Sequence, residues 1–124
     1  MEAGDTFRLV GVADRHTWVI LSDPAVDAER VLLVSLTGYY PGMDSSCIVE
    51  VDELSILDKR SCIYYADIKE ASVAALEQLQ AAGKLQKRTP VALQLLARIR
   101  EGVSLSRDIE VKHIEFLIGQ GVIE

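Results

Sequence analysis

Apolar and polar positions in the first half of the chain form short runs, alternating or continuous, that are typical of β-strands. Turn-forming residues such as Asp23-Pro24 and Pro41-Gly42 separate the runs. Since no helical spacing lies between them, a parallel α/β sheet is not expected. A small antiparallel barrel or curled sheet is predicted instead, with strands over residues 6–10, 17–21, 31–36, 47–51 and 61–65.

The second half of the chain changes to the spacing of three and four residues that is typical of amphipathic helices. Asp67, followed by Glu70, resembles a capping box, and Gly83 is a natural helix end. Thr89 before a proline, and later Ser106, resemble two further helix starts. These signals predict helices over residues 68–82, 90–101 and 107–118, with a basic loop at 84–88.

A single α+β domain over residues 1–124 is therefore expected, with barrel strands in 1–66 and the helical part in 67–118. The formal net charge is −6. Residues 1–65 hold eleven acidic and five basic residues, whereas residues 66–124 hold eight of each. Because non-specific nucleic-acid binding depends mainly on neutralising phosphates, RNA is expected to bind only at a small local basic patch.

No apolar run is long enough to span a bilayer, and the first residues lack a signal-peptide pattern, so we expect a soluble, cytoplasmic protein. Cys47 and Cys62 lie in predicted strands and are expected to be buried free thiols rather than a disulfide. With two histidines and no Cys-x-x-Cys or His-x-x-x-His spacing, we predict neither a metal site nor a cofactor.

Candidate chemistry lies at the ends of two predicted strands. His16 precedes the strand at 17–21, and Thr37 follows the strand at 31–36. If these strands pair as an antiparallel hairpin, His16 and Thr37 meet at the same rim of the sheet. An imidazole accepts and donates protons near neutral pH, and a hydroxyl donates to phosphoryl oxygens. Both residue types also suit ordinary strand ends, so the residues alone leave both interpretations open.

Basic and aromatic residues near this rim are candidates for binding a nucleic acid. Arg15 precedes His16, while Arg60 and Ser61 lie at the start of the fifth predicted strand. Arginines and hydroxyls bind backbone phosphates, although solvated turns have the same composition. The chain has tyrosine pairs at 39–40 and 64–65. The pair at 39–40, beside Pro41, can stack on a base from a loop, but such residues more often pack the corner of a barrel.

Three short motifs follow one another along the chain. Gly4-Asp5 begins the first strand, the segment His16-Thr17-Trp18-Val19-Ile20-Leu21-Ser22 covers the second, and Val34-Ser35-Leu36-Thr37 ends the third. In this order they resemble the MazF/PemK family of toxin endoribonucleases over roughly residues 4–101. The family's first motif has a catalytic arginine where this chain has His16, and its second motif has a catalytic threonine that corresponds to Thr37.

The resemblance implies a small SH3-like antiparallel β-barrel followed by two or three C-terminal helices. It also implies a metal-independent endoribonuclease that cleaves single-stranded RNA through attack of the 2′-hydroxyl on the adjacent phosphate. The implied catalytic residues are His16 and Thr37, and Arg15, Arg60 and Ser61 are candidates for binding the RNA backbone. The implied partners are single-stranded RNA, an antitoxin protein and a second copy of the chain in a homodimer. Because histidine replaces arginine, a non-catalytic protein-interaction module with the same barrel is the alternative.

Overall fold

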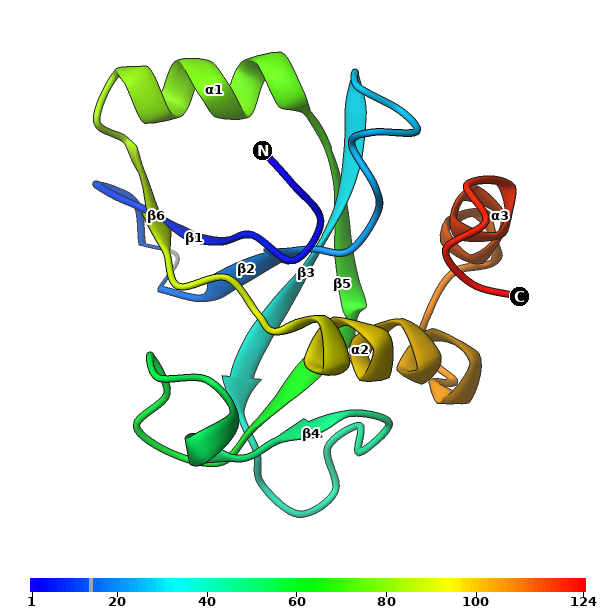
Figure 1. The fold of residues 1–124 in the computed structure, drawn as a ribbon. Helices are drawn as coiled ribbons and strands as arrows, with labels where there is room; N and C mark the ends of the chain where they lie inside the picture. The colour runs from blue at the N-terminus through cyan, green and yellow to red at the C-terminus, as the bar shows by residue number, and fades with distance from the viewer. Residues whose placement is uncertain (14) are drawn as a thin grey trace.

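Six strands form one antiparallel sheet in the computed structural model, which describes residues 1–13 and 15–124 (Figure 1). The sheet curls into a half-barrel, and its strand order is β4-β5-β3-β2-β1-β6. Together with three α-helices, it gives the predicted α+β class. The strands are β1 (Thr6–Leu9), β2 (Thr17–Ile20), β3 (Arg30–Gly38), β4 (Ile48–Val49), β5 (Ser61–Ser72) and β6 (Leu85–Arg88). The helices are α1 (Val73–Ala81), α2 (Leu93–Leu105) and α3 (Val111–Gly119), with a short 3-10 helix η1 at Val51–Glu53.

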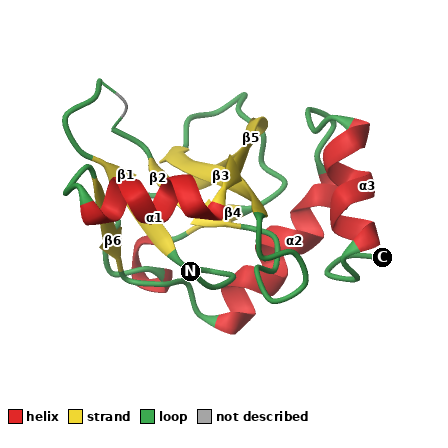
Figure 2. Ribbon diagram, turned by 90° about the horizontal axis from the view of Figure 1, so that it is seen from above, coloured by secondary structure: helices red, strands yellow, loops and turns green. Residues whose placement is uncertain are grey.

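The central strand β3 contains a continuous apolar run, Val31-Leu32-Leu33-Val34. Because successive residues of a strand point to opposite sides, this run makes both faces of the sheet apolar. Leu32, Val34 and Leu36 face α2 and α3, which contribute buried residues such as Ile99 and Leu117. The opposite face packs against α1 and β6 through Trp18, Ile20, Val31, Leu33, Leu76 and Leu85. Figure 2 shows α2 and α3 together at one end of the molecule, away from β1 and β6.

Helix α2 is attached to the sheet through a buried tyrosine. The Tyr65 hydroxyl donates a hydrogen bond of 2.6 Å to the carbonyl oxygen of Ile99. A Cβ atom on Gly102 would overlap this hydroxyl. Glycine at 102 therefore allows the helix to approach the strand closely.

Strand β5 is longer than predicted, so the predicted capping box at Asp67 and Glu70 is wrong. Glu70 pairs with Leu32, within the part of β5 that extends β3's hydrogen-bonded ladder. The backbone groups at the start of β3 need partners, and residues 69–72 supply them. Helix α1 starts after Ser72, whose side chain accepts a hydrogen bond from a backbone amide, and the predicted stop at Gly83 is confirmed by its φ of +73°.

The part of the chain predicted to be helical also contains strand residues. Residues 85–88, expected as a loop, form β6 and pair with β1. Thr89 does not begin a helix because its carbonyl accepts the Thr6 hydroxyl at 2.7 Å, which holds this segment along the start of β1. Ser106 ends α2 rather than starting α3, and its hydroxyl donates to Asp44 at 2.6 Å.

Cys47 and Cys62 are buried free thiols, as predicted. Burial raises the pKa of both thiols above the ordinary value for cysteine. Ile48 pairs with Cys62, so the preceding residue Cys47 points to the other face of the sheet. In the described part of the chain, no helix has both the length and the apolar character needed to cross a bilayer.

Candidate functional site

The antiparallel hairpin considered in the sequence analysis is present as β2 and β3. Thr17 pairs with Leu36, and Trp18 pairs with Ser35. His16 directly precedes the paired residues of β2, and Thr37 directly follows Leu36 on β3. His16, which is exposed, and Thr37, which is half-buried, are therefore both at this rim of the sheet.

Strand β5 adds its own residues on the other side of Thr37. Thr37 pairs with Cys62, and the Tyr39 amide donates to the Arg60 carbonyl at 3.0 Å, which continues the ladder past the strand end. Because strand residues alternate between faces, Arg60 and Tyr64 lie on the same side as Cys62 and Thr37. We refer to His16, Thr37, Arg60 and Tyr64 as the Thr37 face.

The structure places two of the predicted backbone-binding residues away from this face. Ser61 alternates to the opposite side of β5, is buried, and donates its hydroxyl to the Lys59 carbonyl at 3.1 Å. Arg15 is exposed in the loop before β2 and lines a shallow hollow of about 270 Å³ together with Arg8. Arg60 is the predicted phosphate ligand that the sheet brings to Thr37.

Two residues near Thr37 are not among the predicted site residues. Tyr64 is 41% exposed, although Tyr65 beside it is buried in the core. Tyr64 lies diagonally across from Thr37, because its partner on β3 is Ser35. The signal was the alternation along β5, in which one tyrosine of a pair must face outward. The second residue is Lys59, which lies in the segment just before β5.

Lys59 places a positive charge at the same rim. Its aliphatic side chain lies where a Cβ on Gly38 would be, directly after Thr37. Its ammonium group is 5.4 Å from the centroid of the Tyr40 ring and 3.3 Å from the Tyr40 hydroxyl. Tyr40 is 61% exposed, so the rim offers an aromatic surface as well as a positive charge.

An acidic residue also reaches this rim. The Nε atom of Arg60 lies 2.9 Å from a carboxylate oxygen of Glu50. Both side chains are about half exposed, at 59% and 46%. Since an exposed ion pair contributes roughly 0–1 kcal/mol, a phosphate can replace Glu50 on Arg60 at a small cost in free energy.

Among residues 1–13 and 15–124, no group of three or more His, Cys, Asp or Glu side chains is arranged to hold a metal ion. No protein-family model matches the chain, and no curated protein matches it.

Proposed function

We propose that the protein is a metal-independent endoribonuclease that cleaves single-stranded RNA at the Thr37 face. The observation that supports the proposal is the register of β2 and β3, in which Thr17 lies opposite Leu36, so that His16 and Thr37 are the next residue on each strand. The proposed site has their side chains meeting there, a group that can transfer protons beside a hydroxyl donor. Arg60 lies on the same side as a ligand for a phosphate.

In the proposed reaction, the His16 imidazole takes the proton of a ribose 2′-hydroxyl. The 2′-oxygen then forms a bond to the adjacent phosphorus, and the bond from phosphorus to the 5′-oxygen breaks. The products are a 2′,3′-cyclic phosphate and a 5′-hydroxyl, whose proton comes from water. The Thr37 hydroxyl donates to a non-bridging phosphate oxygen, where negative charge increases in the transition state.

Single-stranded RNA suits this face because its bases are free to stack. Tyr64 and Tyr40 are both substantially exposed, and aromatic rings of this kind bind unpaired bases. Lys59 and Arg60 supply local positive charge on a chain whose net charge is −6. The acidic remainder disfavours extended contacts, so binding is confined to a few nucleotides.

The rival function is a non-catalytic protein-interaction module. It is favoured by one observation, the ion pair between Arg60 and Glu50, which occupies the cation assigned to the phosphate. Under this alternative, the Thr37 face binds a protein partner. The wild-type protein then does not cleave RNA, so a substitution at His16 has no cleavage rate to lower.

The two functions are separated by cleavage of end-labelled single-stranded RNA of mixed sequence in the presence of EDTA. The wild-type protein is expected to cleave, and His16→Gln is expected to lower the rate by about 100-fold or more, in line with loss of a general base. Thr37→Val should lower the rate by about 10- to 100-fold.

The matched control is His113→Gln, which removes the other histidine of the chain on α3 and should keep the activity. Thermal unfolding of each variant verifies that it is folded at the assay temperature. Failure of the folded wild-type protein to cleave any of the RNAs would overturn the enzyme and leave the interaction module.

A further inference from the structure

Two polar side chains reach the same short backbone segment at the end of β2, which is the end opposite to His16. The Nε atom of Arg100, on α2, donates to the Leu21 carbonyl at 3.0 Å. Gln120, which follows α3, accepts a hydrogen bond of 2.8 Å from the Asp23 amide through its side-chain oxygen. Both side chains are thus held in place by the backbone of residues 21–23.

Each of these side chains also carries a buried donor that lacks an acceptor. Neither Nη2 of Arg100 nor Nε2 of Gln120 has a hydrogen-bond partner among the described residues. Burial lowers the pKa of Arg100, and the nearby charge of Asp23 opposes this effect only in part. Buried polar groups are almost always paired, since an unpaired one costs about 1–3 kcal/mol. Of the two side chains, Arg100 also lines a cleft, and its guanidinium therefore has hydrogen-bonding capacity left for an acceptor that enters there.

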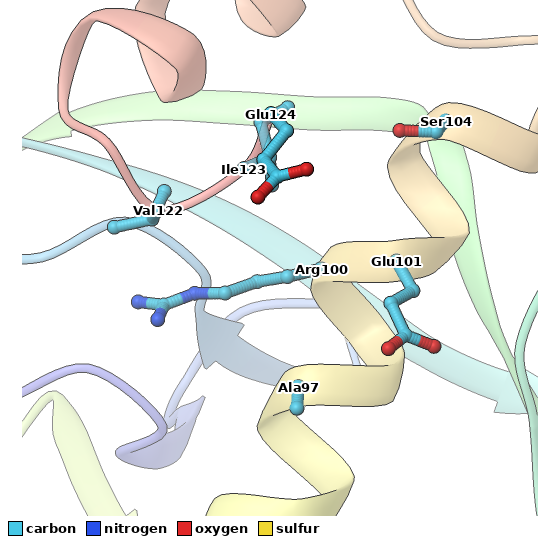
Figure 3. A pocket seen from close by; sticks show the side chains of 7 residues that line it. All are labelled: Ala97, Arg100, Glu101, Ser104, Val122, Ile123 and Glu124. Carbon is cyan, nitrogen blue, oxygen red and sulfur yellow. The ribbon is translucent and has the colours of Figure 1, made fainter.

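A cleft of about 530 Å³ opens onto Arg100, between α2 and the last residues of the chain. Figure 3 shows the Arg100 side chain extending toward Val122 and away from Glu101. Ala97 and Ile123 add apolar surface to the walls. The volume lies within the range of roughly 300–1,000 Å³ that is common for small-molecule sites.

We propose that this cleft binds a small organic carboxylate with an apolar body. The guanidinium of Arg100 donates to the carboxylate oxygens, and Ala97 and Val122 contact the apolar body. The site is separate from the Thr37 face and does not depend on the proposed ribonuclease activity.

The acidic lining of the cleft decides between a carboxylate and a phosphate. Glu101 and Glu124 line the same cleft as Arg100. Their charges repel a dianion more strongly than a monoanion. The planar fork of a guanidinium also matches the two oxygens of a carboxylate. A monocarboxylate is therefore the anion that fits both the cation and its acidic neighbours.

The test is a titration of the full chain, labelled with ¹⁵N, followed by the side-chain Nε signal of Arg100 and the backbone amides of α2. Three probes are compared: isovalerate, 3-methylbutanol, which has the same apolar body without the carboxylate, and inorganic phosphate. Isovalerate should give a saturable shift at Arg100, and the other two probes should bind at least about tenfold more weakly, since charged hydrogen bonds contribute about 1.5–3 kcal/mol.

Variants identify the donor. Arg100→Met should weaken isovalerate binding by about 10- to 100-fold, whereas Arg107→Met, at an exposed position outside the cleft, should not. If Arg100→Met does not fold, Ala97→Phe gives the answer, because a ring at this exposed position fills the cleft. Its control is Ala81→Phe, on the exposed surface of α1.

Three results would overturn the site. The first is no saturable shift at Arg100 with isovalerate. The second is equal binding of the acid and the alcohol, or binding that survives in folded Arg100→Met or Ala97→Phe. The third is a shift of the Arg100 signal in Glu124→Gln as large as the shift caused by isovalerate, because the chain's own carboxylate would then be the acceptor.

Discussion

Gly102→Ala tests how closely α2 is held to the sheet. The new Cβ would overlap the Tyr65 hydroxyl and come within 2.8 Å of the ring atom that carries it. The ring cannot simply turn away, because Tyr65 is 1% exposed and its hydroxyl is hydrogen-bonded to the Ile99 carbonyl. Either α2 moves outward or the hydrogen bond breaks.

The expected cost follows from three contributions. Overpacking of a buried site costs about 1–3 kcal/mol, and loss of the Tyr65–Ile99 hydrogen bond costs about 1 kcal/mol more. Against these, alanine is favoured over glycine within a helix by about 1 kcal/mol. Gly102→Ala should therefore lower the free energy of unfolding by about 1–3 kcal/mol.

Urea unfolding followed by the fluorescence of Trp18, the single tryptophan of the chain, measures this change. The matched control is Gly119→Ala on α3, where a Cβ would have no neighbour within 4 Å. The control should be neutral or stabilising by up to about 1 kcal/mol. Tyr65→Phe should reduce the cost of Gly102→Ala, since it removes the first atom that the Cβ meets. If Gly102→Ala is as stable as Gly119→Ala, the close contact between α2 and β5 does not exist.

Burial, the largest effect on His113, lowers its pKa below 6.5, so the unfolded chain binds more protons and stability should fall as the pH drops below 6.5. Urea midpoints on either side of pH 6.5 should show this fall, and His113→Gln should remove it. Burial raises the pKa of Asp44, but hydrogen bonds from Ser106 and Ser46 to its carboxylate have the larger combined effect and hold the pKa below 3.8. Its contribution to stability is present above pH 3.8 and is lost as the pH falls further, so Ser106→Ala should reduce the acid sensitivity measured by unfolding at low pH. Cys47 and Cys62 should react slowly with a thiol reagent in the folded protein and quickly in urea, because burial blocks access and raises their pKa values. Rapid labelling of both thiols before unfolding would contradict the buried placement.

Local patterns predicted the strands of the first half well because their apolar runs are short and bounded by turns. They failed where distant contacts decide the structure. Asp67 and Glu70 match a helix cap, yet this segment is needed as the partner of the far end of β3. Likewise, Thr89 matches a helix start, but its carbonyl accepts a hydrogen bond from Thr6, which is 83 residues away in the sequence. No local pattern carries that information.

The candidate site also has features that the sequence predicts and features that only the packed structure decides. The antiparallel pairing of β2 and β3, whose ends carry His16 and Thr37, was predictable because a hairpin fixes which strand ends are neighbours. Whether Ser61 faces Thr37 or the opposite side depends on the register of β5. A shift of one residue exchanges the two faces, and the sequence does not specify the register that closely. The unpaired donors of Arg100 and Gln120 had no sequence signal, since they come together only when α2 and α3 pack on the end of β2.

The proposed reaction depends on a ribose hydroxyl, and a substrate can be built to remove it. An RNA oligonucleotide that the protein cleaves is compared, in EDTA, with the same oligonucleotide carrying a single 2′-deoxyribose at the cleavage position, and the product ends are identified by mass spectrometry. We predict a 2′,3′-cyclic phosphate and a 5′-hydroxyl from the all-ribose strand, and no cleavage at the deoxyribose. Equal cleavage at the deoxyribose, or no cleavage of any all-ribose strand, would contradict the account.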